Sequence, residues 1–371
     1  MFKKVKIDVV MCIAWLLAAV SAFFVHPDRE YIGYIDFRSL GILWGLMVII
    51  QGFKANGLFE KTADALLAHV SKGRQLSLVL IFICFVGGMF ITNDVALITF
   101  VPLSIMMLRG CGREDIMIPV IVLQTIAANL GSMLTPIGNP QNLYLYGLTG
   151  MPLTDFLLLM LPYSLVSAVL LLISVFLLPG QNKPLNLSSR SEGGKKTGSL
   201  QSTIIYAILF VIAFLSVLRV IPWYILAAIV FVAVLCIDRK LLLKADYVLL
   251  LTFIGFFIFT GNMSRIPVIR DLLNEVIGGR EFYAAVLSSQ VISNVPAALL
   301  LSSYTTNYND LIIGVNAGGL GTLIASMASL ISYKAYAKEY KGSSLKYIAV
   351  FTGFNVCFLA VMIVVYIVRL S

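Results

Sequence analysis

Asn129-Leu-Gly-Ser-Met-Leu-Thr-Pro-Ile-Gly-Asn-Pro-Gln-Asn142 interrupts a long apolar part of this chain, and Asn316-Ala-Gly-Gly-Leu-Gly-Thr-Leu-Ile-Ala-Ser-Met-Ala-Ser329 interrupts another. At an offset of 187 residues, the separation of 129 and 316, the segments match at Asn129/Asn316, Gly131/Gly318, Thr135/Thr322 and Ile137/Ile324. Lipid offers backbone groups no hydrogen-bond partners, so such interruptions persist at membrane depth only inside protein or beside a water-filled cavity. Duplicated interruptions in two halves of a membrane protein point to a transport site.

The composition of the chain sets its broad class. Of 371 residues, 60% are hydrophobic and 12% are charged, and the mean hydropathy is +0.96, far outside the soluble range. Apolar runs approach the roughly 20 residues that a spanning helix needs at 7–25, 37–53, 156–178, 201–219, 222–237, 245–262 and 345–368. Interrupted apolar stretches lie at 75–108, 116–147, 281–303 and 311–333. The sequence predicts an all-α polytopic membrane protein.

Two further features of the sequence are less specific. The start, with Lys3, Lys4 and Lys6 before an apolar run that ends near Ala22, could imitate a cleaved signal peptide. That run is long for a signal core, so we expect it to form the first spanning helix. The five cysteines lack the paired spacing of a metal site, and we expect them to act as small apolar packing residues.

The basic residues indicate a topology. We place the N-terminus in the cytoplasm and treat 75–108 and 281–303 as re-entrant hairpins that do not cross the membrane. Of the 27 basic residues, those then left outside are Arg29, Arg38, Arg219, Arg265, Arg270, Arg280 and Arg369. This asymmetry is the one that the positive-inside rule predicts. The basic balance therefore indicates orientation and contact with anionic lipid rather than nucleic acid.

This topology divides the chain into an inverted-topology repeat with two re-entrant hairpins and two discontinuous transmembrane helices. Amphipathic segments at 57–68 and 266–276 have apolar stripes at helical spacing and are expected to lie in the membrane interface. The expected parts are an N-terminal transmembrane helix with an outer loop (1–36), a first repeat (37–179), a cytoplasmic linker rich in Gly, Ser and Lys (180–199) and a second, inverted repeat (200–371).

The hairpin tips carry the residues most suited to binding. Asn93 and Asp94 lie between apolar runs of similar length, which places them near the membrane midplane. An intramembrane carboxylate is a functional hypothesis by default, although Asp94 could instead cap a helix start. The second tip has Ser293 and Asn294 as an expected helix cap and Val295 in place of Asp94. A cation is therefore expected to prefer the first tip.

The two interruptions are expected to differ in structure. Thr135 to Asn142 cannot form a regular helix, because its two prolines remove backbone donors and clash with preceding carbonyls. Gly138 and Asn139 would supply bare backbone and an amide oxygen that face the first hairpin tip. The equivalent stretch from Ala325 to Ser329 contains no proline, and a kinked helix held by small residues is an open alternative there.

These paired motifs resemble the ion transporter superfamily, in particular the citrate transporter-like domain shared by divalent anion:sodium symporters and arsenite permeases. The stretch from Asn129 to Asn142 looks like the sodium-site loop of the symporters, and Gly321 to Ile331 looks like a loop of the arsenite permeases. The resemblance covers nearly the whole chain. Symporters carry Ser-Asn-Thr at both tips, from which this chain departs at Asp94 and Val295. That departure argues against a bulky dicarboxylate substrate.

The resemblance implies alternating access, with no cofactor, Na⁺ or H⁺ as the coupling ion, and a homodimer. It places one Na⁺ at Asn93, Asp94, Gly138 and Asn139, and a second, weaker cation at Ser293, Asn294, Ala325 and Ser326. It places a small inorganic or carboxylate anion between the tips, against Thr92, Thr135, Asn142, Ser293, Asn294 and Ser329. The expected location is the plasma (inner) membrane, with lipid as the surrounding partner and the N-terminus cytoplasmic.

Other functions fit the sequence less well or remain open. A Na⁺/H⁺ antiporter could use the single intramembrane Asp94, and an arsenite-type oxyanion efflux permease could use the same scaffold. A membrane enzyme is disfavoured, because the sequence has no His-Glu-x-x-His zinc motif and no second membrane aspartate to share a proton with Asp94. A channel is disfavoured too, since broken helices in inverted repeats suit a closed central site.

Overall fold

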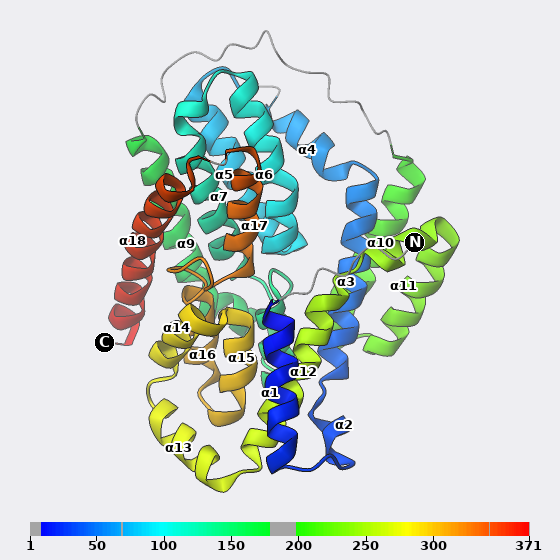
Figure 1. Ribbon diagram of the computed structural model, residues 1–371. Helices are drawn as coiled ribbons and strands as arrows, with labels where there is room; N and C mark the ends of the chain where they lie inside the picture. Colours follow the sequence, from blue (N-terminus) through cyan, green and yellow to red (C-terminus); the bar gives the residue numbers. More distant parts are fainter. Residues whose placement is uncertain (1–8, 68–69, 179–197, 341, 371) are drawn as a thin grey trace.

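The computed structural model describes residues 9–67, 70–178, 198–340 and 342–370, and every regular element in those ranges is a helix (Figure 1). The helices up to the middle of the chain are α1 (Val9–Phe24), α2 (Glu30–Tyr34), α3 (Phe37–Ala55), α4 (Leu58–Leu67), α5 (Gly73–Ile91), α6 (Asn93–Gly110), η1 (Glu114–Ile116), α7 (Met117–Ser132), α8 (Pro140–Thr149) and α9 (Leu153–Leu177). Those that follow are α10 (Leu200–Val217), α11 (Trp223–Asp238), η3 (Arg239–Lys244), α12 (Tyr247–Ser264), α13 (Pro267–Ile277), α14 (Glu281–Ile292), α15 (Asn294–Leu301), η4 (Ser302–Tyr304), α16 (Tyr308–Ala317), α17 (Met327–Glu339) and α18 (Ser344–Leu370).

Eight segments of the described chain are long and apolar enough to cross a membrane as helices. They are α3, α5, α6, the segment from Glu114 to Ser132, α9, α10, α12 and α18. The predicted all-α polytopic membrane protein is therefore confirmed. The expected first span is shorter than predicted in its described part, because α1 covers 16 residues from Val9 to Phe24. Most of the expected linker at 180–199 lies outside the described residues.

Two helix pairs from distant parts of the chain pack closely, α1 on α12 and α11 on α3. At Gly255 of α12 a Cβ would lie 3.1 Å from the backbone and side chain of Ala14, and at Gly45 of α3 it would lie 3.4 Å from Leu226. Small residues let helices approach closely in lipid, where side-chain packing drives their association. In Figure 1, α3, α10 and α11 stand on the right, and α1 and α12 stand between them and the α14–α15 hairpin, against which α12 packs.

Short helices connect this group to the rest of the molecule. Between α3 and α5, α4 buries Phe59, Ala63 and Leu67, which lie four residues apart and so share one face. Between α12 and α14, α13 buries only Ile277. Both predicted amphipathic segments therefore form helices, at opposite ends of the view in Figure 1.

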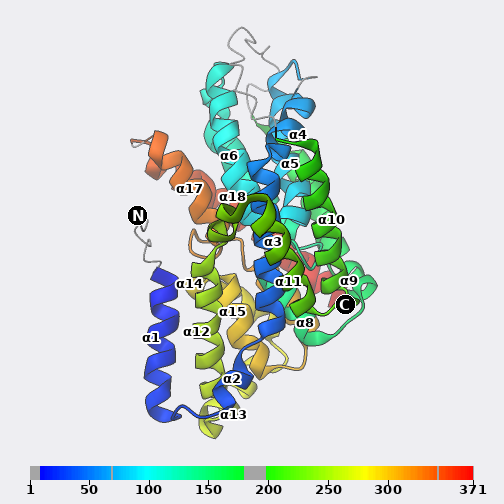
Figure 2. The same cartoon turned by 90° about the vertical axis from the view of Figure 1, so that its right-hand side faces the viewer.

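The hairpins and the interrupted helices occupy the other side of the molecule. The α5–α6 hairpin lies in the upper half of Figures 1 and 2, and the α14–α15 hairpin lies in the lower half. The first interrupted helix runs from α7 in the upper half to α8 in the lower half, and the second runs from α16 in the lower half to α17 in the upper half. Both interruptions therefore fall in the middle of the molecule.

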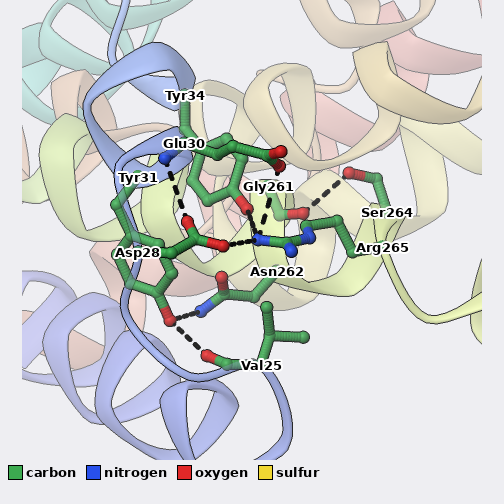
Figure 3. Close-up of polar contacts among 9 residues, drawn as sticks. All are labelled: Val25, Asp28, Glu30, Tyr31, Tyr34, Gly261, Asn262, Ser264 and Arg265. Atoms are coloured by element: carbon green, nitrogen blue, oxygen red, sulfur yellow. Dashed lines mark hydrogen bonds and ion pairs between the residues drawn. The ribbon is translucent and has the colours of Figure 1, made fainter.

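A polar cluster joins the loop after α1 to the end of α12 (Figure 3). Arg265 donates hydrogen bonds to Asp28 at 2.7 Å and to the hydroxyl of Tyr34 at 3.0 Å, and Glu30 lies 3.4 Å from the same guanidinium nitrogen. The Asn262 amide donates to the hydroxyl of Tyr31 at 2.8 Å. The cluster ties the N-terminal helix to the point where α12 leads into α13.

The hydrogen bond from Arg265 holds the pKa of Asp28 below its ordinary value of 3.8. A carboxyl group whose pKa is lower in the folded state stabilises the fold above its ordinary pKa, and this contribution is lost as the pH falls through the folded value. Asp28→Asn is expected to lower the melting temperature slightly at pH 7. The difference from the parent protein is expected to shrink below about pH 4 and to vanish once the pH lies below the lowered pKa of Asp28. Thermal unfolding of both proteins across this range, in low and high salt, measures it, and a difference that persists at low pH would contradict the assignment.

Candidate functional site

Both hairpin tips hold a non-glycine residue in a backbone conformation that normally needs glycine. Thr92 has φ 68° and ψ 149°, and Ser293 has φ 74° and ψ 153°. Such conformations cost of order 1–3 kcal/mol and persist only where the surrounding structure imposes them. They cluster at binding sites and switch regions. The two tips therefore share the same imposed backbone conformation, although Thr92 and Ser293 are 201 residues apart in the chain.

Each tip is hydrogen-bonded to the interruption that follows it in the chain. The backbone N–H of Asn93 donates to the carbonyl of Gly138 at 3.1 Å, and the N–H of Asn294 donates to the carbonyl of Ala325 at 2.9 Å. The structure thus places the Gly138 and Ala325 turns against the tips, as the sequence predicts.

A second matched pair of hydrogen bonds involves the aligned threonines. The hydroxyl of Thr135 donates to the carbonyl of Met89 at 2.5 Å, and that of Thr322 donates to the carbonyl of Gln290 at 3.2 Å. Met89 and Gln290 lie near the ends of the helices that lead into the two tips. Each threonine therefore fixes its interruption to the first arm of its hairpin.

The two interruptions are also bonded to each other. The Asn139 amide donates to Oδ1 of Asn316 at 3.0 Å, and the Ser326 hydroxyl donates to Oδ1 of Asn129 at 3.0 Å. Asn139 and Ser326 are related by the same offset of 187 residues as Asn129 and Asn316. All four side chains are at most 4% exposed. The Asn93 amide adds a second donor to Asn129 at 3.0 Å, which connects the first tip to this pair.

The two hydrogen bonds between the interruptions are expected to contribute unequally to the free energy of unfolding. Asn316 accepts one of them, and Ser326 donates the other. Asn316→Leu deprives Oδ1 of Asn142 of its 2.6 Å donor and leaves the Asn139 amide with Ser132 alone, at a cost of about 1–3 kcal/mol for a buried group left unpaired. Ser326→Ala leaves Asn129 its hydrogen bond from Asn93 and is expected to cost about 0.5–1.5 kcal/mol. Thermal or denaturant unfolding in detergent compares them, and an equal loss for both variants would contradict the asymmetry.

The first interruption lies between α7, which ends at Ser132, and α8, which begins at Pro140. Asn139 caps α8, because its Oδ1 accepts from the N–H of Asn142 at 2.9 Å. Proline occupies the first helical position, where its missing N–H costs nothing. The predicted break around Gly138 and Asn139 is therefore present.

The second interruption is broader than a kink. α16 ends at Ala317 and α17 begins at Met327, so the alternative of a kinked helix was wrong. The Gln290 side chain holds the intervening backbone open. Its amide donates to the carbonyls of Gly318 and Leu320, both at 3.0 Å, and its oxygen accepts from the N–H of Thr322 at 2.9 Å.

Ser293 occupies the expected N-cap position of α15, whereas the alternative that Asp94 caps α6 was wrong. The Ser293 hydroxyl donates to the carbonyl of Ala325 at 3.4 Å and makes no capping bond to α15. At the first tip, Thr92 occupies the capping position and Asp94 is the second residue of α6. The N–H of Asp94 is bound by Oδ1 of Asn93 at 2.9 Å, so the Asp94 carboxylate is not required for the helix start.

The remaining site candidates fall into engaged and unengaged side chains. The Asn142 amide donates to the carbonyls of Met133 and Thr135, and its oxygen accepts from Asn316, so its polar atoms are all in use. By contrast, Oδ1 of Asp94 and the hydroxyl of Ser329 are buried and lack a hydrogen-bond partner among the described residues.

Gln141 was not predicted as a site residue, and its Oε1 is likewise buried without a partner in the described chain. It is the second residue of α8, and its side chain is 2% exposed. Buried polar atoms without a partner are uncommon in native structures and call for a bound group or water. Gln141 lies within the interruption that the sequence singles out, but its residue type alone did not distinguish it from a packing side chain.

Residues 1–311 match a family model described as citrate transporter. The chain belongs to this citrate transporter family. The inner membrane protein YbiR of Escherichia coli is 30% identical over 323 residues, which cover 85% of this chain and 84% of that protein. An uncharacterized transporter of Methanocaldococcus jannaschii, MJ0456, is 31% identical over 313 residues and covers 84% of each chain.

A more local similarity links this citrate transporter family member to the human P protein. The two are 28% identical over 133 residues, which are 34% of this chain and 15% of the P protein. Within the described residues there is no group of three or more His, Cys, Asp or Glu side chains that could hold a metal ion. The family match, the two similar membrane proteins and the eight candidate spans in the described chain together make this protein a multi-pass membrane transporter of the citrate transporter family.

Proposed function

We propose that this transporter carries a small inorganic or carboxylate anion together with Na⁺ by alternating access. The observation that supports it is the carboxylate of Asp94, beside a strained hairpin tip that is bonded to a helix break. Its Oδ1 is buried and has no partner in the part of the chain that the structure describes. An intramembrane carboxylate without a partner attracts a cation, and unwound carbonyls at a helix break supply further oxygen ligands.

The first cation site that we propose consists of Asn93, Asp94, Gly138 and Asn139. The Gly138 carbonyl already points at the tip, because it accepts from the N–H of Asn93, and a carbonyl oxygen has a second lone pair for a cation. The Asn139 oxygen is used by the N–H of Asn142. Asp94 would therefore supply the negative charge, and the carbonyl would supply a neutral ligand.

The second cation site that we propose consists of Ser293, Asn294, Ala325 and Ser326. It has the same bond from a tip N–H to a turn carbonyl, but Val295 replaces the carboxylate. It would therefore bind a cation more weakly than the first site.

The substrate would lie between the tips, against Thr92, Thr135, Ser293, Asn294 and Ser329, with Asn142 behind them. The hydroxyl of Ser329, which no described residue engages, supports this placement, and Oε1 of Gln141, likewise unengaged within the described ranges, extends it. The strained tips immediately precede helices α6 and α15. The first N–H groups and the positive dipole ends of these helices favour an anion. The side chain of Asn142 would orient the site rather than contact the anion, because its polar atoms are already in use.

The mechanism that we propose treats the two hairpins as re-entrant and the halves as inverted repeats, with boundaries at 37–179 and 200–371. Three pairs of matched hydrogen bonds support this symmetry. They join each tip to its interruption, each aligned threonine to its hairpin, and the two interruptions to each other. The hairpins and broken helices would move against α1, α3, α11 and α12, which would also form a homodimer. The N-terminus would be cytoplasmic, in the inner membrane of the cell.

Transport assays in liposomes test this proposal. The purified protein is reconstituted, Na⁺ and proton gradients are imposed independently, and uptake of small carboxylates and inorganic oxyanions is followed together with internal pH. Anion accumulation driven by Na⁺ supports the symporter. A change in internal pH driven by Na⁺ without uptake of solute would replace it with a Na⁺/H⁺ antiporter, and solute movement indifferent to both gradients would favour an oxyanion permease.

A further inference from the structure

An apolar groove lies on the outer side of the first hairpin, between α4, α5, α6 and α9. It has a volume of about 650 Å³, and Thr62 is the polar side chain in an otherwise apolar lining. Val86 and Phe90 of α5 line it and are each 50% exposed. The groove therefore opens sideways toward the surroundings of the protein, where a transporter meets lipid.

A basic side chain lies one helical turn beyond the lining of this groove. Leu78 of α5 and Leu172 of α9 line the groove; Arg74 comes four residues before Leu78, and Phe176 comes four residues after Leu172. Residues four apart lie on the same face of a helix. The Arg74 guanidinium stacks over the Phe176 ring at 4.7 Å from its centroid. The Arg74 and Phe176 pair thus continues the two walls of the groove by one turn.

The Arg74 guanidinium has unused donor capacity. Its Nε is buried and has no hydrogen-bond partner among the described residues. It lies in the first turn of α5, where the positive end of the helix dipole adds to its charge. Lys72 precedes it, and the sequence from Ala65 to Asn93 contains no Asp or Glu. This end of the groove is therefore positively charged without a matching acid nearby in the chain.

The acidic residues of α4 face away from the groove. Thr62 and Leu66 line it, and Glu60 and Asp64 are exposed on another side of this helix, since residues two apart do not share a face. A groove with apolar walls and a cationic end matches the chemistry of a phospholipid, in which acyl chains join a phosphate through glycerol.

We propose that this groove binds an acyl chain of an anionic phospholipid and that Arg74 binds the headgroup phosphate. Arginine binds phosphate through charge-assisted and often bidentate hydrogen bonds. Basic residues at the membrane surface select anionic over zwitterionic lipid by charge. The bound lipid contacts both α4, which leads from α3, and the arms of the hairpin. If the hairpin moves as proposed above, lipid would influence that movement, but binding itself does not depend on the transport mechanism.

Native mass spectrometry of the purified protein, titrated with phosphatidylglycerol or phosphatidylcholine, tests the site. Arg74→Gln is expected to lower the apparent affinity for phosphatidylglycerol about fivefold, the ratio that corresponds to about 1 kcal/mol per basic residue. Arg74→Lys is expected to retain most of the preference for the anionic lipid. Lys240→Gln is the matched control, since Lys240 is exposed on η3, which contributes no residue to the lining of the groove.

A second variant tests the apolar part of the site. Gly87 lines the groove, and a Cβ there would meet its nearest atom, in the Phe100 ring, at 3.4 Å, an ordinary contact. Gly87→Leu therefore extends a side chain into the groove and is expected to reduce binding of both lipids. It also carries the test if Arg74→Gln does not fold. Equal affinity of the parent protein for both lipids, or undiminished phosphatidylglycerol binding by Arg74→Gln or Gly87→Leu, would overturn the proposal.

Discussion

Asp94→Asn is expected to abolish the dependence of transport on the cation gradient while the protein remains folded. The substitution keeps the shape of the side chain and removes its negative charge, which is the feature that would hold the cation. The fold loses no hydrogen bond at Oδ1, because that atom has no partner among the described residues. The N–H of Asp94 keeps its bond to Asn93, since the backbone is unchanged.

The measurement is the rate of anion uptake in liposomes with and without an inward Na⁺ gradient. Thermal unfolding of the same samples reports whether the variant is folded. Asp64→Asn is the matched control, because it removes an exposed carboxylate from α4 and should leave the response to Na⁺ intact. A folded Asp94→Asn protein that still responds to Na⁺ would remove Asp94 from the cation site and leave only the neutral ligands at the tips.

The sequence was sufficient to locate the tips and the breaks, because their physical cause is local. Prolines around Gly138 and Asn139 exclude a regular helix whatever surrounds them. The offset that aligned Thr135 with Thr322 also identified two side chains with the same role, each bound to a carbonyl near the end of a hairpin arm. A repeated polar residue in an apolar sequence marks a repeated contact, even when the contact itself cannot be seen.

What the sequence did not supply depends on contacts between distant residues. The bond from Asn139 to Asn316 joins residues 177 positions apart, and neither residue type specifies its partner. The second break has no proline, and it is held open by the side chain of Gln290, 28 to 32 residues away. Gln290 has Met89 as its counterpart in the first half, so comparison of the two halves gave no signal for it.

The aligned glycines show how tightly each hairpin is joined to its interruption. A Cβ at Gly131 of α7 would overlap the backbone carbonyl of Phe85 in α5, and one at Gly318 would lie 2.6 Å from the hydroxyl of Ser289 in α14. At Gly88, α5 approaches the backbone of α7 again, because a Cβ there would lie 2.9 Å from the carbonyl of Ala128. Helix α5 and helix α7 therefore touch through their backbones at two points about one turn apart.

Gly131→Ala is accordingly expected to be the most destabilising single methyl addition where the first hairpin packs on α7. A carbonyl oxygen cannot rotate out of the way as a side chain can, so the added methyl must push α5 from α7. Overpacking of a close contact costs about 1–3 kcal/mol and occasionally more. The same shift would stretch the bond from Thr135 to Met89 and the bond from Asn93 to Gly138. The expected result is a markedly lower melting temperature and weaker Na⁺ dependence in the folded fraction.

Gly87→Ala separates this backbone contact from a general effect of adding a methyl to the hairpin. Gly87 lies in the same helix α5, and its added Cβ would meet only side-chain atoms, at 3.4 Å or more. Its melting temperature should stay near that of the parent or rise slightly, because alanine is the better helix former. If Gly131→Ala melted at the same temperature as Gly87→Ala, α5 and α7 would be able to separate at little cost. The tip and the break would then have to be held together by their hydrogen bonds alone, and the hairpin could move independently of α7 during transport.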